Sequence, residues 1–172
     1  MTGPIPDSYW VIENRFLAGE YPGAFDPDEA RAKLERFLDH GVNLFIDFTE
    51  DWELNAYAGL AKEQGDARQM RVAHERFPIR DVSIPTEEEM DAILARIKLA
   101  LEAGHTCYVH CWGGVGRTGT VVGCWLVQEE GTSPENAIAR IAQWRSDTPD
   151  GWKRSPETDE QRAFIERWAA RT

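Results

Sequence analysis

The feature that most constrains this chain is a glycine-rich segment, residues 111–119, that lies between a strand-like run and a helix-like run. The apolar residues 107–109 precede it and favour a buried strand, and residues 120–127 follow it and favour a helix. A strand, a glycine-rich loop and a helix N-terminus in this order can cradle an anion, because the loop amides can point inward and the helix dipole adds positive potential. The segment therefore predicts an α/β architecture with an anion site at the carboxyl end of a strand.

Two chemically distinctive side chains, Cys111 and Arg117, lie six positions apart in this loop. The planar guanidinium of Arg117 can bind two oxygens of one phosphate group. Cys111 would lie at the base of the cradle, where the positive potential favours the thiolate over the thiol. We therefore expect a nucleophile and an oxyanion clamp in the same loop.

Three other interpretations of the loop agree less well with the sequence. The run Gly114-x-Gly116-x-x-Gly119 satisfies the dinucleotide-binding pattern, but that fold needs a further strand and an acidic residue about twenty positions on. Residues 133–136 start another helix instead. A nucleotide P-loop needs a lysine where this chain has Arg117. A purely structural glycine turn around a buried cysteine leaves Arg117 and Asp81 unexplained.

Residues 110–119 resemble the Cys-x5-Arg-Ser/Thr signature of the cysteine-dependent protein tyrosine phosphatases. With His110 before the cysteine and Thr118 after the arginine, the stretch is most similar to the dual-specificity branch of that superfamily.

A second stretch, residues 77–85, resembles the general-acid loop of the same family. Asp81 lies about thirty residues before Cys111, as the resemblance requires. The order of the predicted strands and helices agrees with the family over residues 10–168, which is nearly the whole chain.

The resemblance implies a role for each of three side chains. Cys111 is the nucleophile that attacks phosphorus and forms a phosphocysteine, and Arg117 stabilises the equatorial oxygens of the transition state. Asp81 protonates the leaving oxygen and then accepts a proton from the attacking water. The alternative for Asp81 is a loop-capping aspartate. Asp91 and residues 87–89 are weaker candidates for the acid, because they read as solvated helix surface.

Further residues around the nucleophile follow from the same resemblance. The hydroxyl of Thr118 would bond the sulfur of Cys111 and make it a better leaving group, although an ordinary first-turn threonine is the alternative. His110 is expected behind the loop, which it orders. Together with Arg117, the phosphate-binding residues would be Trp112, Gly113, Gly114, Val115 and Gly116.

The roles of Trp112 and Gln161 stay open. The indole of Trp112 could line the pocket mouth and stack on a substrate ring, or it could pack beneath the loop. Gln161 resembles the glutamine that positions the hydrolytic water in some tyrosine phosphatases, which would place it close behind the reacting groups. However, Thr158-x-x-Gln161 is also a capping box, and we favour that interpretation.

The chain is acidic, with 30 Asp and Glu against 19 Lys and Arg and a net charge of −11. Such a surface repels nucleic acid and anionic membranes, so we expect neither as a partner. No apolar run approaches membrane-spanning length, and the N-terminus lacks the basic and apolar regions of a signal peptide, so we expect a cytoplasmic protein.

Three cysteines, an odd number without metal-ligand spacing, argue against a disulfide framework and against zinc, and we expect no metal and no cofactor. Cys107 or Cys124 could form a protective disulfide with Cys111. Their apolar surroundings favour buried, inert thiols instead.

We expect a single phosphatase domain over residues 1–172 with an α/β fold, in which a central, largely parallel (mixed) sheet of about five strands is flanked by helices. Strands are predicted at residues 9–12, 15–18, 42–48, 70–77 and 106–110, and helices from Asp26, Asn55, Thr86, Arg117, Ser133 and Thr158.

The expected function is dephosphorylation of phosphorylated proteins by a metal-independent monomer at phosphotyrosine, while action on phosphoserine or phosphothreonine stays open because it depends on the depth of the pocket. Phosphoinositide phosphatases of this superfamily carry lysines in the loop, and this loop has none. One alternative is a phosphatase for a small molecule of the inositol phosphate type. A second alternative is a catalytically silent phosphoprotein-binding module. The retained Cys, Arg, Thr and Asp count against it.

Overall fold

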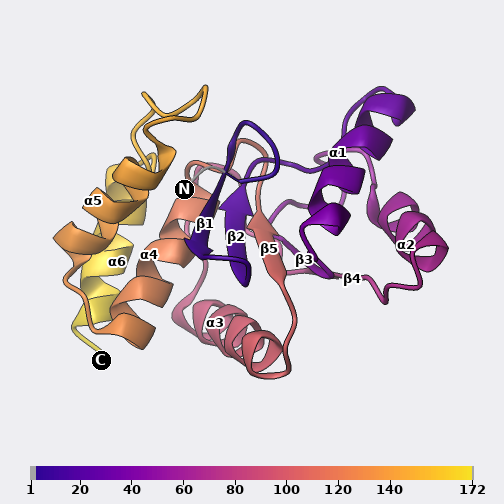
Figure 1. The fold of residues 1–172 in the computed structure, drawn as a ribbon. Helices are drawn as coiled ribbons and strands as arrows, with labels where there is room; N and C mark the ends of the chain where they lie inside the picture. The colour runs from indigo at the N-terminus through magenta and orange to yellow at the C-terminus, as the bar shows by residue number, and fades with distance from the viewer. Residues whose placement is uncertain (1–2, 172) are drawn as a thin grey trace.

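The computed structural model describes residues 3–171, which form a mixed five-stranded sheet with the order β1-β2-β5-β3-β4 (Figure 1). The strands are β1 (Ser8–Ile12), β2 (Phe16–Gly19), β3 (Leu44–Asp47), β4 (Ala73–Arg76) and β5 (Cys107–His110). β1 pairs antiparallel with β2, and the other neighbours pair parallel. The prediction of a central, largely parallel sheet of about five strands is confirmed.

Six helices flank the sheet within the described residues. They are α1 (Pro27–Asp39), α2 (Ala58–Ala67), α3 (Glu87–Glu102), α4 (Arg117–Glu130), α5 (Pro134–Arg145) and α6 (Asp159–Ala169). In Figure 1, α1 and α2 lie on one side of the sheet and α4, α5 and α6 lie on the other. In the part of the chain that the structure describes, no helix is long and apolar enough to cross a membrane.

Most of the helix starts follow the signals in the sequence. The side chains of Asp26, Thr86, Ser133 and Thr158 cap α1, α3, α5 and α6, because each oxygen accepts a backbone N–H of the first turn. The helix expected from Asn55 begins later, at Ala58, where no side chain caps it. The strand expected over residues 70–77 is shorter, because the N–H of Met70 closes a turn with Gly65 after α2.

Side chains on the strands alternate between two cores, as the two-residue period of a strand requires. In β3, Leu44 and Ile46 pack with residues of α3, α4, α5 and α6, whereas Phe45 packs with residues of α1 and α2. In β5, Val109 joins the first core and Tyr108 joins the second. Both faces of the central strand are therefore covered by helices.

The helix α4 is buried from Arg117 to Val127. A helix that is covered all round lies in the interior of a protein, and α4 packs between the sheet and the pair α5 and α6 (Figure 1). Its first residue is therefore fixed in space next to the end of β5.

The parallel strands β2, β5 and β3 end at the same edge of the sheet. Their register pairs both Gly19 and Asp47 with His110, the last residue of β5. In folds of this kind ligands bind beyond the carboxyl ends of the strands. This edge therefore positions the loop at residues 111–116.

Candidate active site

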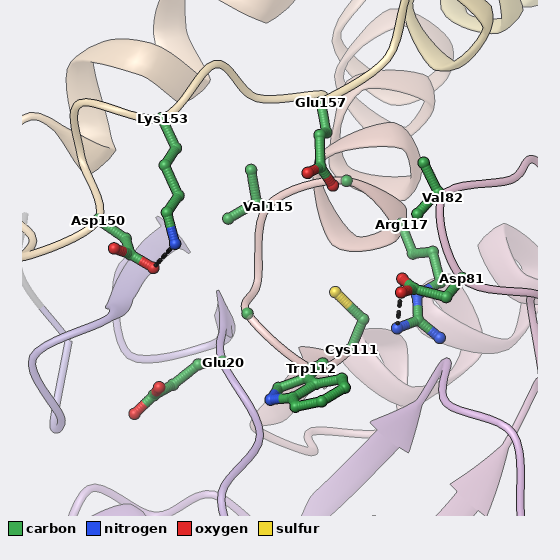
Figure 2. Close-up of a pocket in the computed structure, with 12 residues that line it drawn as sticks. Glu20, Asp81, Val82, Cys111, Trp112, Val115, Arg117, Asp150, Lys153 and Glu157 are labelled. Carbon is green, nitrogen blue, oxygen red and sulfur yellow. Dashed lines mark hydrogen bonds and ion pairs between the residues drawn. The ribbon is translucent and has the colours of Figure 1, made fainter. Parts of the chain in front are cut away.

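A cavity of about 360 Å³ lies at this edge, with Cys111 in its wall. Figure 2 shows the sulfur of Cys111 near the centre of the lining residues, with Arg117 and Asp81 on one side and Asp150 and Lys153 on the other. The full lining consists of Glu20, Asp81, Val82, Cys111, Trp112, Gly113, Val115, Gly116, Arg117, Asp150, Lys153 and Glu157. Segments far apart in the sequence therefore meet around one sulfur atom.

Cys111 directly follows β5, and only 3% of its surface is exposed. The hydroxyl of Thr118 donates a hydrogen bond to its sulfur over 3.1 Å. The loop then leads into α4, whose N-cap Gly116 offers no side-chain hydrogen bond. The first N–H groups of a helix lack partners within the helix, so this end can bind an anion.

Arg117 is 2% exposed, and its guanidinium is held from several directions. Glu53 accepts from Nη1 at 2.8 Å and from Nη2 at 2.5 Å, and the carbonyl of Ile79 accepts from Nη1 at 3.1 Å. Asp81 forms a further ion pair with Nη2 at 3.0 Å (Figure 2). Because a buried charge without partners is very unfavourable, these contacts fix the position of the guanidinium.

Glu53 was not anticipated from the sequence. It lies between β3 and α2, and its side chain is largely buried against Arg117. Burial opposes its ionisation, but hydrogen bonds from Arg117 outweigh burial and lower the pKa of Glu53. Both charges of this pair are therefore present at neutral pH.

Asp81 lies in a turn between β4 and α3 that forms one wall of the cavity. Its carboxylate meets Arg117, and its side chain is 56% exposed. The weaker acid candidates lie elsewhere: Asp91 pairs with Arg171, and Glu89 belongs to the capping box of α3. Neither lines the cavity.

His110 lies fully buried behind the loop. Its Nδ1 is 3.0 Å from the carbonyl oxygen of Cys111, and its Nε2 is 2.6 Å from the hydroxyl of Tyr57. A carbonyl only accepts, so Nδ1 carries the proton and Nε2 accepts from Tyr57. Burial lowers the pKa of His110 to about 4, and the ring is neutral at pH 7.

Two further side chains lie beside His110, and sequence reasoning did not find them: Tyr57 forms the hydrogen bond of 2.6 Å, and Oδ1 of Asp47 lies 3.9 Å from Nε2. Asp47 accepts from Thr49 and contacts the side chains of His74 and Arg76. Burial opposes its ionisation, but these contacts lower the pKa of Asp47. Asp47 lies one residue before the end of the strand predicted at residues 42–48, so the rule that parallel strands end at one edge could have placed it here. Tyr57 carries no comparable signal.

The expected phosphate-binding residues take different positions. Trp112 is 57% exposed at the rim of the cavity and is not packed beneath the loop (Figure 2). Gly113, Val115 and Gly116 line the cavity, whereas Gly114 lies against β2.

Gln161 does not line the cavity. It is fully buried at the start of α6, where it forms the predicted capping box with Thr158, which is confirmed. Its side-chain amide also donates to the carbonyl of Ser83 over 3.0 Å.

All three cysteines are free thiols. Burial raises the pKa of Cys107 to about 12 and raises that of Cys124 well above its usual value, so both stay protonated. Within residues 3–171, no group of three or more His, Cys, Asp or Glu side chains could hold a metal ion.

Replacement of Gly114 by alanine tests the fit of the loop against β2. Gly114 has φ +67°, and a Cβ there would lie 2.3 Å from the carbonyl carbon of Gly19. We expect a loss of roughly 2–5 kcal/mol in the free energy of unfolding, from the left-handed backbone and the clash together. Urea denaturation of both proteins measures it. The matched control is Gly59→Ala, because Gly59 lies in open space on α2 and should tolerate the change. Equal stability of the two variants would contradict this account.

The buried His110 predicts loss of stability in mild acid. Its pKa is about 4 in the folded protein and about 6.5 in an unfolded chain, so between these values only the unfolded state binds the proton. Stability therefore falls as the pH decreases through this window, by about 2 kcal/mol from pH 7 to pH 5. Urea denaturation at both pH values measures the change. His110→Gln should remove most of this difference, whereas the exposed His40→Gln should keep it. If His110→Gln still loses the same stability between pH 7 and pH 5, other groups cause the pH dependence.

Comparison with known proteins agrees with this geometry. Residues 23–131, well over half of the chain, match the family described as "Polymorphic toxin system, DSP-PTPase phosphatase". The human dual specificity protein phosphatase CDC14C is 29% identical over 140 residues, which cover 78% of this chain and 29% of the relative. The putative tyrosine phosphatase 067L of Invertebrate iridescent virus 3 is 26% identical over 168 residues, or 92% of this chain and 64% of the relative. The chain thus spans less than two thirds of the length of these relatives.

Solved structures extend the similarity over the whole fold. A mutant form of Tk-PTP is 25% identical and superimposes with a TM-score of 0.71, covering 96% of each chain. The kinase associated phosphatase superimposes with a TM-score of 0.75 over 99% of this chain and 97% of its own, at 19% identity, which shows a common fold. The family match, the signature loop and the shared fold lead to one conclusion: the chain belongs to the DSP-PTPase phosphatase family.

Proposed function

We propose that residues 1–172 form a single-domain cysteine-dependent phosphatase that hydrolyses phosphate monoesters of phosphoproteins through a phosphocysteine intermediate. One observation carries the proposal: Cys111, Arg117 and Asp81 line the same cavity, and Thr118 donates to the cysteine sulfur. A nucleophile, an anion clamp, a candidate acid and a hydroxyl that stabilises the thiolate are the groups that two-step phosphoryl transfer requires.

In the first step the sulfur of Cys111 attacks phosphorus, and the bond from phosphorus to the ester oxygen breaks. Asp81 in its acid form gives its proton to that oxygen, which leaves as an alcohol or phenol. Arg117 and the backbone N–H groups at the start of α4 bind the oxygens on which negative charge develops. The product is a phosphocysteine and an ionised Asp81.

In the second step a water molecule attacks the phosphocysteine. Asp81 takes the proton of the water, the bond from sulfur to phosphorus breaks, and inorganic phosphate forms. The leaving group is the thiolate of Cys111, which the hydroxyl of Thr118 stabilises over 3.1 Å. The enzyme returns to its starting protonation state.

The ion pair between Glu53 and Arg117 prepares the clamp before substrate binds. Glu53 occupies one side of the guanidinium, and Asp81 contacts Nη2. A phosphate group that binds Arg117 through Nη2 would replace the contact with Asp81 and release this carboxyl group for proton transfer. Phosphate binding and the release of the Asp81 carboxyl group are thereby coupled through Nη2 of Arg117.

The lining of the cavity supports a phosphoprotein substrate over a highly charged small molecule. Four carboxylates surround the sulfur, from Glu20, Asp81, Asp150 and Glu157, while Lys153 is the one cation besides Arg117 in the lining. An inositol phosphate carries several phosphate groups, and like charges at short range disfavour its binding. A single phosphate on a protein side chain needs only the loop and Arg117.

The setting that we propose for this activity is the cytoplasm, where a reducing environment keeps the three thiols free. The partner is a phosphorylated protein, and the chain acts as a monomer that binds neither nucleic acid nor a membrane. The net charge of −11 supports the last two points, because both surfaces are anionic.

Cys111→Ser tests the covalent mechanism. We expect turnover of an aryl phosphate to be abolished, because a serine hydroxyl without a base is not nucleophilic at neutral pH, while phosphate still binds through Arg117 and the loop amides. The measurements are release of the phenol and calorimetric titration with inorganic phosphate. Cys124→Ala, a change at a buried thiol outside the cavity, is the control and should keep turnover. Residual activity in the serine variant would rule out Cys111 as the nucleophile.

The same serine variant identifies the substrate class. It should retain phosphorylated proteins in a pull-down, and these should be lost when inorganic phosphate competes. Preference for an inositol phosphate over every phosphopeptide in steady-state turnover would favour the small-molecule alternative. No turnover of any phosphate ester by the wild type would favour a silent binding module.

Asp81→Asn should produce a defect that depends on the leaving group. A general acid matters most when the leaving oxygen is strongly basic, and its usual contribution is roughly 10²–10⁴-fold. The loss should be large for a tyrosyl or alkyl ester and small for a nitrophenyl ester. Rates for both esters are compared in wild type and variant. Asp91→Asn on α3 is the matched control. If the defect that depends on the leaving group occurs in this variant and not in Asp81→Asn, Asp91 is the general acid.

A further inference from the structure

The turn that carries Asp81 has an unfavourable backbone conformation. It spans residues 80–83 and is closed by a hydrogen bond of 3.1 Å from the N–H of Ser83 to the carbonyl of Arg80. Val82, at its third position, has φ +59°. A β-branched residue in the left-handed region is disfavoured, and glycine or asparagine is the residue that this position usually takes. The turn therefore needs support from outside to keep its shape.

Gln161, at the start of α6, supplies that support. Its side chain is fully buried, and Nε2 donates to the carbonyl of Ser83 over 3.0 Å. Its Oε1 accepts from the backbone N–H groups of Glu157 and Thr158 at 3.0 and 3.1 Å. Through these three hydrogen bonds, the side-chain amide of Gln161 joins the start of α6 to the end of the Asp81 turn.

The capping box of α6 does not require this amide. The box of α3 is built with Glu89 at the equivalent position, where a carboxylate oxygen accepts from the N–H of Thr86. Only an acceptor oxygen is needed there. The donor Nε2 of Gln161 is therefore an addition to the box, and its partner is the Asp81 turn.

Arg117 contacts the first part of the turn and the residue before it. It donates to the carbonyl of Ile79 over 3.1 Å, and its Nη2 meets Asp81 at 3.0 Å. The second contact is the one that a bound phosphate would replace. After that exchange, the link from Gln161 to Ser83 keeps the end of the turn in place.

We propose that Gln161 is a positioning residue that holds Asp81 over Cys111 through the carbonyl of Ser83. The inference rests on the proposed role of Asp81 as the general acid. It assigns to Gln161 a function in the first chemical step, because the acid acts on the leaving oxygen there. A glutamine that positions the hydrolytic water would instead slow the second step equally for every ester.

The experiment compares Gln161→Glu with Thr158→Ala. The glutamate keeps an acceptor for the capping box but replaces the donor to Ser83, and its effect should deepen as the pH rises and the new carboxyl ionises. The alanine variant weakens the capping box and leaves the amide in place. Turnover of a tyrosyl ester and of a nitrophenyl ester is measured in both, together with the melting temperature. A displaced acid should lower the tyrosyl rate on the order of tenfold more than the nitrophenyl rate.

The expected results separate positioning from capping. Gln161→Glu changes the ratio of the two rates, whereas Thr158→Ala lowers the melting temperature and leaves the ratio unchanged. In the Asp81→Asn background, Gln161→Glu should add no further change to the ratio, because it acts through Asp81. If Gln161→Glu does not fold, the uncharged Gln161→Met takes its place, with Thr158→Ala as its reference.

Three outcomes would overturn the inference: an unchanged ratio in the Gln161 variant, an equal change in Thr158→Ala, or an additive effect without Asp81. Each of these presumes that the wild type hydrolyses both esters and that Cys111→Ser does not. Loss of that baseline would instead refute the proposed function.

Discussion

The buried charge of Arg117 is the constraint on which the rest of the site depends. A guanidinium that is 2% exposed must be matched by partners, and here they are Glu53, Asp81 and the carbonyl of Ile79. These partners come from the segments that follow β3 and β4, while Arg117 itself begins α4. Satisfying one charge therefore fixes three segments of the chain relative to one another, and the cavity at Cys111 is the space that they enclose.

Behind this clamp, a neutral network supports the nucleophile loop. His110 bridges the carbonyl of Cys111 and the hydroxyl of Tyr57, and burial keeps the ring uncharged at pH 7. An uncharged imidazole leaves Arg117 and the start of α4 as the positive groups next to the sulfur. The arrangement gives a local positive potential beside the sulfur, inside a chain with a net charge of −11.

Membership of the DSP-PTPase phosphatase family gives this geometry its chemical context. The proposed reaction uses each group once per step: sulfur attacks, Arg117 holds the oxygens, and Asp81 moves the proton. Within the site, the turn that carries Asp81 depends most on contacts from other elements, because Val82 occupies a backbone conformation that valine disfavours. Its position is set jointly by Arg117 and by Gln161, residues that belong to two different helices.

The sequence by itself determined the features that depend on local spacing. Glycines between a strand and a helix predict the anion loop, the caps at Asp26, Thr86, Ser133 and Thr158 predict four helix starts, and alternation of strands and helices predicts the largely parallel sheet. Only the tertiary structure decided which distant side chains meet the loop. Glu53 and Tyr57 lie in or beside a short coil segment whose composition carries no periodic signal, and the link from Gln161 to Ser83 joins residues 78 positions apart. Such contacts follow from how the elements pack, because a buried charge or hydrogen-bond donor pairs with the partner that the fold brings near it. Local sequence does not encode which residues come close in this way.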